Sequence, residues 1–230
     1  MKNILKLPVI FILLFSFLSS CTDTEKKVVK IYFDEYPEVI HEKFEVAKED
    51  TSLKIGFYKR FNEEGVLREE ANFKNGVLHG ERKLYYPTGE LFIVEVHEDG
   101  NFHGPYFSYF ENGNPREEGE FVNNAIHGIW KNFHQNGKVN EIVTFRNGEE
   151  HGPFEKYHEN GALAAVGQYE NSKETGDWIY YHDNGNVREE VNYLEGWENG
   201  LVKVFDEEGN LWKEIIYERG RVQQYNEYPL

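Results

Sequence analysis

Glycine recurs in this sequence at a fixed interval of 24 residues, and this interval restricts the chain to a repetitive fold. All 21 glycines occupy four positions of one 24-residue frame. The first of these positions opens each unit and is held by Gly56, Gly80, Gly104, Gly128, Gly152, Gly176 and Gly200. A sequence period of about 20–50 residues is typical of proteins built from stacked supersecondary units. The frame therefore predicts seven tandem units over residues 56–223.

Each unit carries the signature of two β-strands joined by tight turns. In residues 67–74, every second side chain from Leu67 to Phe73 lies on one face, and a period of two is the spacing of a strand. Pairs such as Asn112-Gly113 predict hairpins, because a type I′ turn needs two positive φ angles. Pairs such as Asn75-Gly76 mark a second turn. These patterns predict an all-β fold, an elongated antiparallel meander of about fourteen strands in a single rolled or twisted sheet.

Aromatic columns supply the candidate binding residues. Positions are counted from the first glycine of a unit, so that Gly128 is position 0 and Trp130 is position 2. The candidates are Tyr106, Trp130, Phe154 and Trp178 at position 2, and Tyr109, Phe133, Tyr157 and Tyr181 at position 5. These two positions have opposite parity, so either the first strand contains a bulge or both faces bear aromatic residues. The rings are either the core of the sheet or an exposed binding row, and both interpretations stay open.

The two flanks of the repeat array lack the glycine frame. Residues 28–55 predict degenerate capping strands, and residues 224–230 predict a C-terminal cap that closes the last edge. Residues 1–20 predict a signal peptide, with basic Lys2 and Lys6 and an apolar run from Leu7 to Leu18 that is too short to span a bilayer.

The end of this leader resembles the lipobox of bacterial lipoproteins. The matching residues are Leu18-Ser19-Ser20-Cys21, and Cys21 is the only cysteine of the chain, so it has no disulfide partner. In lipoproteins the peptide is cut before this cysteine, which then carries the lipid. We therefore expect a lipidated tether at residues 21–27. The protein would be anchored in the bacterial cell envelope, on the periplasmic face or the outer surface.

The units closely resemble the MORN-repeat variant. The resemblance rests on His127-Gly128-Ile129-Trp130, Phe133, Asn136-Gly137, Phe145 and Asn147-Gly148, and on His151-Gly152-Pro153-Phe154 with Tyr157 and Asn160-Gly161. This variant populates bacterial proteins grouped as antitoxin components of the YwqK type. The resemblance implies an elongated sheet of stacked hairpins that serves as a contact platform, and some relatives are credited with binding acidic phospholipids. The net charge of −16, which becomes −18 once Lys2 and Lys6 are removed with residues 1–20, opposes that property and also nucleic-acid binding.

Recurring histidines and glutamates raise the question of catalysis or metal binding. The histidines are His79, His103, His127 and His151 at position 23, and His134, His158 and His182 at position 6. Equivalent residues of adjacent units lie about 9.6 Å apart, whereas zinc ligands lie about 2.1 Å from the ion, so we predict no metal site and expect each histidine to bond or pack against its own turn. Glu69, Glu117, Glu141 and Glu189 at position 13 are interpreted as a solvated or cross-strand-paired face. Without a nucleophile or phosphate-binding motif, we predict no enzyme and no cofactor.

Three functions are compatible with these features. The leading hypothesis is a membrane-anchored, non-catalytic scaffold that binds another protein through its repeat sheet. The alternative is an antitoxin or immunity protein that neutralises a toxin, which a neighbouring toxin gene would favour. The third is glycan binding through exposed Trp130 and Trp178, which loss of glycan-array binding in Trp→Ala variants would favour.

Overall fold

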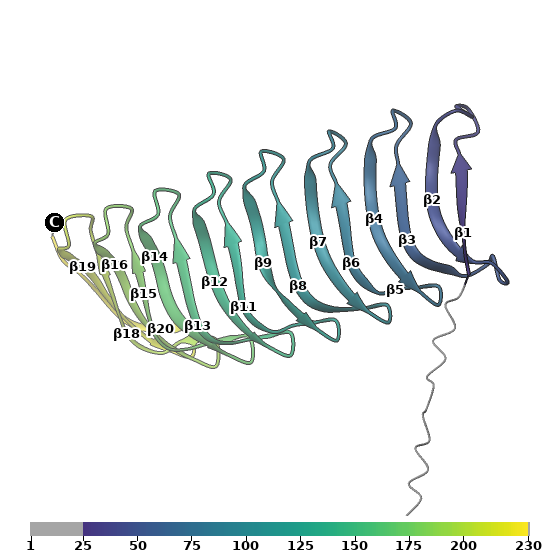
Figure 1. The fold of residues 1–230 in the computed structure, drawn as a ribbon. Coiled ribbons are helices and arrows are strands. Elements are labelled where there is room, and N and C mark those ends of the chain that lie inside the picture. Colours follow the sequence, from purple (N-terminus) through teal and green to yellow (C-terminus); the bar gives the residue numbers. More distant parts are fainter. Residues whose placement is uncertain (1–24, 230) are drawn as a thin grey trace, which may run out of the picture.

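The computed structural model describes residues 25–229 and contains one open antiparallel sheet of 20 strands. The predicted signal peptide and Cys21 lie outside these residues. Strands follow one another in chain order, from β1 (Lys26–Tyr32) at one edge to β20 (Arg221–Glu227) at the other (Figure 1). The predicted all-β meander of hairpin repeats is confirmed. Residues 25–229 contain no helix that is long and apolar enough to cross a membrane.

Each 24-residue unit contributes a first and a second strand. The first strands are β3 (Lys54–Phe61), β6 (Gly80–Tyr85), β8 (Asn101–Tyr109), β11 (Gly128–Phe133), β13 (Glu149–Tyr157), β15 (Lys173–Tyr181) and β18 (Gly200–Phe205). The second strands are β4 (Leu67–Lys74), β7 (Leu91–Glu98), β9 (Pro115–Val122), β12 (Val139–Arg146), β14 (Leu163–Glu170), β16 (Val187–Leu194) and β19 (Leu211–Glu218). Two-residue strands precede β6, β11 and β18: β5 (Val77–Leu78), β10 (Ala125–Ile126) and β17 (Trp197–Glu198).

The two edges are formed by strands outside the repeat frame. β1 and β2 (Ile40–Ala47) pair with each other, and β2 pairs with β3 of the first unit. β1 begins at Lys26, so Lys26 and Lys27 belong to this strand and not to a tether at residues 21–27. β20 begins at Arg221, within the predicted repeat range 56–223, and continues into residues 224–230. The lysines of β1 discourage pairing of this open edge with another chain.

The two turns of each unit have different conformations. At the second turn both residues have positive φ, as for Asn75 (51°) and Gly76 (82°), which fits a type I′ turn. At the first turn only the glycine does, as for Gly113 (84°), whose amide donates to the Phe110 carbonyl at 2.9 Å. The prediction of a type I′ turn at Asn112-Gly113 is therefore wrong. This geometry is that of a type I turn followed by a left-handed glycine.

A β-bulge on each second strand settles which face each aromatic column occupies. Ser108 pairs with Glu117 and Tyr109 with Pro115, so Arg116 has no partner, and every unit repeats this shift. The first strand has no bulge at this point, so positions 2 and 5 face opposite sides, and both faces bear aromatic residues. Accordingly, the position-5 hydroxyl of Tyr85 donates to Glu70, which lies on the face opposite the position-2 side chains.

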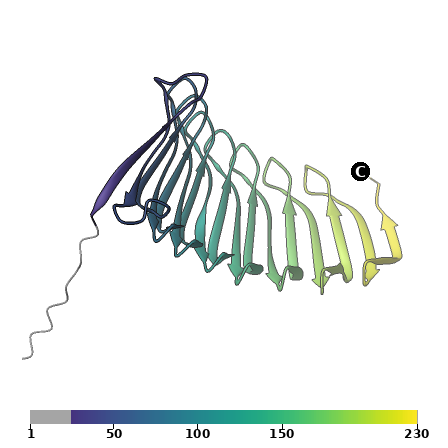
Figure 2. The same cartoon turned by 90° about the vertical axis from the view of Figure 1, so that its right-hand side faces the viewer.

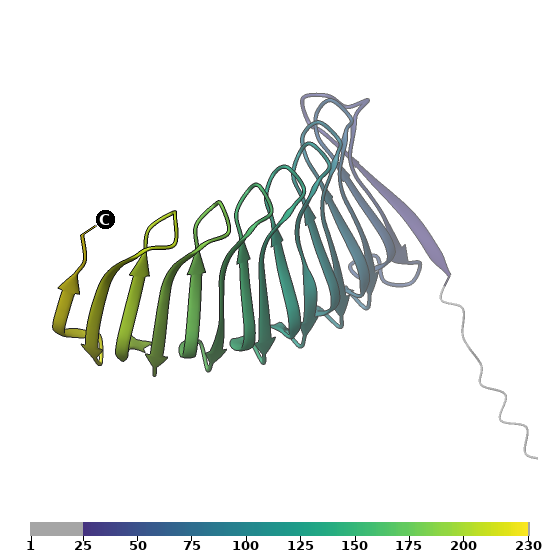
Figure 3. The same ribbon diagram turned by 90° about the vertical axis from the view of Figure 1, so that its left-hand side faces the viewer.

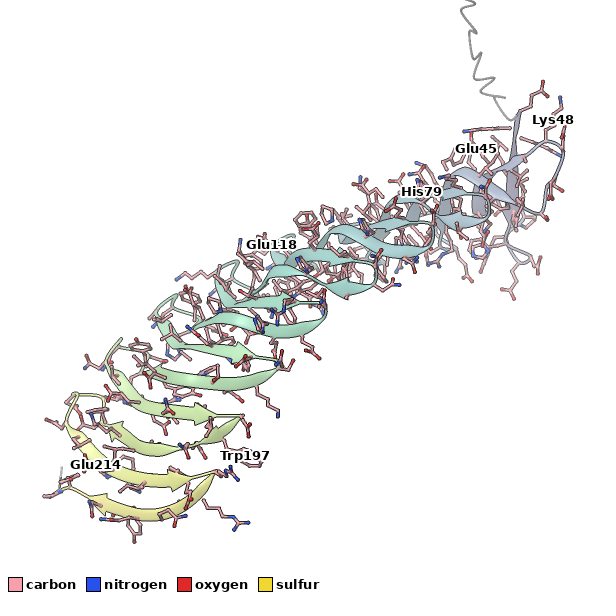
Figure 4. The ribbon with its side chains drawn as sticks, turned by 90° about the horizontal axis from the view of Figure 1, so that it is seen from below. Glu45, Lys48, His79, Glu118, Trp197 and Glu214 are labelled. Carbon is pink, nitrogen blue, oxygen red and sulfur yellow. The ribbon has the colours of Figure 1, made fainter. Side chains whose placement is uncertain are left out.

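The strands curve, so the sheet forms a trough that twists along its length (Figures 1, 2 and 3). Side chains on the inside of a curved sheet converge, whereas those on the outside diverge. Trp178 and Val202, at position 2, are only 3% and 1% exposed, whereas Ile129 and Leu201, at position 1, are 58% and 46% exposed. Position 2 therefore lies on the concave face, together with positions 4, 13, 15, 17 and 22. Seen from below, the C-terminal strands are shallow arcs with side chains on both faces (Figure 4).

Candidate functional site

Large rings fill the middle of the concave face. Tyr106 stacks on Trp130 with ring centroids 5.3 Å apart, and Phe154 lies 5.1 Å from Trp178. Tyr169 and Tyr193 then meet Trp178 edge-on, at 5.2 and 5.9 Å. In a sheet with a single layer, these contacts replace the core that a second layer would provide.

Two glycines leave space for the indole rings of the two buried tryptophans. Gly119 and Gly167 occupy position 15, and they are the glycines whose φ is not positive. A Cβ atom on either would lie 2.1 Å from the indole of Trp130 or Trp178, respectively. The small residue on one strand and the indole on the next are therefore complementary in size.

The eight predicted binding residues do not form one surface. Trp130, Phe154 and Trp178 are buried on the concave face and Tyr106 is half-buried there. The four position-5 residues are half-buried on the convex side, near the first turns: Tyr109, Phe133, Tyr157 and Tyr181. The position-2 column is therefore mainly core, and the residues around it determine what the concave face can bind.

Acidic side chains in the N-terminal half of the concave face have basic partners. Glu69 is only 8% exposed and lies between Arg60 (3.1 Å) and Arg82 (2.8 Å). The guanidinium of Arg82 also meets the carboxylate of Glu95 at 2.8 Å, and His97 lies 3.0 Å from the same carboxylate. These charges form a continuous, partly buried network in which both buried carboxylates are paired, so removing one partner would leave a buried charge unpaired.

An amino group occupies the aromatic cluster at the N-terminal end of the concave face. Lys54 Nζ lies 4.6, 4.3 and 5.7 Å from the ring centroids of Phe44, Tyr58 and Phe73. Its remaining partner is the carboxylate of Glu42, at 3.5 Å. A cation in contact with several ring faces is stabilised by their quadrupoles, more strongly when water is excluded. This end of the trough therefore contains its own bound cation.

The C-terminal half has carboxylates without such partners. Glu150, Glu174 and Glu198 form a row, the acid row, opposite Phe145, Tyr169 and Tyr193. Among residues 25–229 no lysine, arginine or histidine forms an ion pair with them. Burial raises the pKa of the Glu150 carboxyl, and the nearby Glu141 and Glu174 carboxylates raise it further. The acid row is therefore a site of uncompensated negative charge.

A groove of about 540 Å³ lies beside the acid row. This C-terminal groove is lined in part by Phe154, Ala165, Tyr169, Glu174, Trp178 and Tyr180, and Lys156 and Arg188 also line it. The indole N–H of Trp178 is buried without a hydrogen-bond acceptor. Trp130 differs, because its indole N–H lies 3.3 Å from the side-chain oxygen of Asn132, whereas the corresponding residue beside Trp178 is Tyr180. The groove thus combines aromatic rings, a carboxylate of the acid row, basic side chains and an unused indole donor.

Comparison with protein families identifies the repeat. The model of the MORN repeat variant matches residues 56–75, 78–99, 102–123, 126–147, 150–171, 174–195 and 198–219. The chain belongs to the MORN repeat variant family. None of the curated proteins compared with the chain matches it. A crystal structure of a TcdB2–TccC3–Cdc42 complex is similar at 10% identity and a TM-score of 0.24, over 83% of this chain and 13% of that one, so this chain spans a small part of that protein.

Histidines and asparagines connect successive MORN units at the first-turn edge. His134, His158 and His182 each place Nε2 within 2.9–3.1 Å of a carbonyl oxygen of the following unit, on Tyr157, Tyr181 and Phe205. Asn112, Asn136, Asn160 and Asn184 donate to carbonyls of the following unit in the same way. The backbone amides of these histidines bond within their own turns, as expected, whereas their side chains bond the turn of the next unit. Within residues 25–229 no cluster of three or more His, Cys, Asp or Glu residues is arranged to hold a metal ion.

The residues that distinguish the C-terminal groove were not among the sequence candidates. Position 22 is Lys54, Leu78, Phe102 and Ile126 before it becomes Glu150, Glu174 and Glu198. Position 17 changes in parallel from Phe121 and Phe145 to Tyr169, Tyr193 and Tyr217. Both changes are visible in the aligned MORN units, but nothing in the sequence shows that the two positions face each other across adjacent strands.

Proposed function

We propose that this protein is a non-catalytic scaffold that binds another protein through the concave face of its MORN repeats. The observation that carries the proposal is the acid row beside the C-terminal groove, where carboxylates that form no ion pair lie next to aromatic rings. Unpaired carboxylates beside apolar rings favour a partner of complementary charge, because complementary charges make binding specific. The acidic body of the chain makes nucleic acid an unfavourable partner.

The lipid anchor on Cys21 is part of the same proposal. The lipobox-like Leu18-Ser19-Ser20-Cys21 supports it, and β1 begins only a few residues later, at Lys26. A lipid there would hold the sheet by its N-terminal edge, so the C-terminal groove would lie several strands away from the anchored edge. Cys21→Ser should abolish lipid labelling and detergent partitioning in cells. Unchanged labelling of this variant would contradict the anchor.

The structure supports the antitoxin and glycan-binding alternatives to different degrees. A toxin is one form that the protein partner could take, and co-expression with a neighbouring toxin gene tests the antitoxin form of the proposal. Glycan binding by Trp130 and Trp178 receives less support, because both indoles are buried, at 8% and 3% exposed, against Gly119 and Gly167. Few ring faces are therefore free for a sugar.

Two adjacent residues allow a test of which face binds. Lys156 is exposed and lines the C-terminal groove, whereas its neighbour Glu155 lies on the convex face. A photo-reactive amino acid is placed at each position in turn in the full-length chain, and cells are irradiated. We expect one discrete adduct from position 156 and little from position 155. Equal adducts from both positions, or none from 156, would contradict binding through the concave face.

A further inference from the structure

The two ends of the trough use the same register for opposite charges. Phe44 pairs with Tyr58, and Val46 with Lys54, across β2 and β3. Four units later, Val143 pairs with Phe154, and Phe145 with Glu150, across β12 and β13. Lys54 therefore corresponds to Glu150, four residues before the ring of the same strand. The repeat places a carboxylate where the N-terminal end has its internal cation.

The following units repeat this substitution. Glu174 precedes Trp178 by four residues and pairs with Tyr169, and Glu198 pairs with Tyr193. Burial raises the pKa of the Tyr169 hydroxyl, and the carboxylates of Glu174 and Glu150 raise it further, so negative charge is concentrated along this row. A cation at the acid row would relieve the repulsion between these groups and meet ring faces at the same time.

We propose that the acid row, beside the C-terminal groove, takes the lysine or arginine side chains of an extended segment of the partner protein. This inference rests on the proposed protein-binding function. The carboxylates of Glu150, Glu174 and Glu198 pair successive basic residues. The rings of Phe154, Tyr169 and Trp178 contact those side chains as Phe44, Tyr58 and Phe73 contact Lys54.

The spacing of the row selects the conformation of this segment. Adjacent members of the acid row are two strands apart, or about 9.6 Å. A polyproline II helix rises about 3.1 Å per residue with three residues per turn, so every third side chain lies on one face about 9.3 Å apart. A β-strand returns to the same face after two residues, at about 6.6 Å, and matches the row less well. We therefore expect basic residues at every third position.

The unused indole N–H fits the same occupant. A polyproline II segment has no internal hydrogen bonds, so its carbonyl oxygens are free to accept. Trp178 has a buried Nε1 atom without an acceptor, and Trp178 lines the C-terminal groove. A carbonyl of the segment that reaches this buried atom would satisfy the donor.

Synthetic peptides provide the test. The probe is an acetylated and amidated peptide of four Pro-Pro-Lys triplets, titrated against the full-length chain in a neutral detergent. Two control peptides replace lysine by glutamate or group the same four lysines together. The test variant is Glu150→Gln/Glu174→Gln/Glu198→Gln. The matched control, Glu120→Gln/Glu170→Gln/Glu218→Gln, removes the same charge from exposed residues of the convex face.

We expect the test variant to bind the Pro-Pro-Lys peptide at least tenfold more weakly and the convex control less than twofold more weakly. Grouping the lysines should weaken binding at least threefold, and the glutamate peptide should not bind. Equal losses in the two variants would overturn the inference, because they would reduce it to net charge. The inference would also be overturned if the grouped peptide bound as tightly as the Pro-Pro-Lys peptide, or if the Pro-Pro-Lys peptide did not bind.

The failure of this inference differs from the failure of the proposed function. A position-156 adduct that forms equally in the wild type and the Glu150→Gln/Glu174→Gln/Glu198→Gln variant would overturn the basic-segment inference and leave protein binding intact. Equal adducts from positions 155 and 156 would instead overturn the proposed function. Circular dichroism of both triple variants verifies that each retains the β-sheet.

Discussion

In the N-terminal half of the trough, Arg82 and Lys54 neutralise the acidic residues around them, whereas in the C-terminal half the acid row has no basic partner. Both halves share one backbone, one register and the same 24-residue unit. The repeat therefore fixes where side chains lie. The residues at a few positions decide whether the charges on a face are paired within the protein or left for a ligand. The charges are paired within the protein at the N-terminal end and unpaired at the acid row, so the two ends of the scaffold are not equivalent.

Breaking the N-terminal network should have the largest effect. Arg82→Ala leaves Glu69 and Glu95 buried, at 8% and 4% exposed, without their shared cation. Removing one partner of a buried pair costs about 3–5 kcal/mol. The matched C-terminal change is Arg188→Ala, where the guanidinium only lies 5.5 Å from the Tyr180 ring centroid and about 1 kcal/mol is expected. Chemical denaturation measures both, and equal losses would remove the distinction between the halves.

Overfilling position 15 should be the next largest effect and specific to the tryptophan units. Gly167→Ala places a Cβ atom 2.1 Å from the Trp178 indole, and overpacking of a core costs about 1–3 kcal/mol. Ala71, at the same position in the first unit, already carries a Cβ atom and faces no indole. Thermal unfolding of Gly167→Ala and of Gly167→Ala/Trp178→Leu tests the cause. Measured against Trp178→Leu alone, the loss caused by Gly167→Ala should be smaller than in the wild type. An equal loss would argue against a steric conflict.

Removing the internal cation should have a moderate effect. Lys54→Met retains the apolar stem but loses the charge among Phe44, Tyr58 and Phe73. We expect a loss of about 0.5–2 kcal/mol in the free energy of unfolding. Glu174→Gln, at the equivalent position of the C-terminal half, should not destabilise the fold, because it removes an unpaired charge. A destabilising Glu174→Gln would indicate that this carboxylate has a partner within the protein.

The smallest effects concern pH and should have opposite signs in the two halves. Burial raises the pKa of Glu150, so its folded form holds a proton to higher pH than the unfolded chain, and its contribution to stability is lost as the pH rises through the folded value. A hydrogen bond from Lys59 lowers the pKa of Glu70, so its contribution is present near neutral pH and is lost as the pH falls through the folded value.

We therefore expect Glu150→Gln to raise the melting temperature at pH 8 and Glu70→Gln to lower it. Both groups are partly solvated and screened, so each shift should be about 1–2 °C. The differences should shrink toward pH 3, where the carboxyl groups are protonated. Calorimetric scans between pH 3 and pH 8 measure them, and shifts of the same sign would contradict the assignment.

The fold could be predicted from the sequence because each unit repeats its own signals. The glycine columns defined the unit length, and the alternation from Leu67 to Phe73 predicted strands. The faces could not be assigned, because a single unpaired residue such as Arg116 shifts the second strand relative to the first. The first turn was also misjudged, since Asn112 keeps an ordinary φ and uses its side chain to bond Gln135 of the next unit.

The candidate site was only partly visible. The aromatic columns placed Trp130, Phe154 and Trp178 among the candidates, but these rings are core, and the carboxylates without ion-pair partners lie at position 22 beside them. Cross-strand relations decided this, because Glu174 faces Tyr169 only after the bulge and turn geometry set the register. Charge pairing was equally hidden, since Arg82 reaches both Glu69 and Glu95 across neighbouring strands.

The ladder of histidines and asparagines at the first-turn edge is not continued by the side chains of the last unit. In the last unit, Asp206 stands where His182 stands one unit earlier, and Glu208 stands where Asn184 does. Asp206 does not extend toward a further unit, since its carboxylate accepts from the amide and side chain of its own turn residue Asn210, at 2.7 and 3.0 Å. Duplicating an internal unit would therefore lengthen the array with every rung intact. The same unit added after Glu218 would meet a turn whose side chains at positions 6 and 8 donate no hydrogen bond to it.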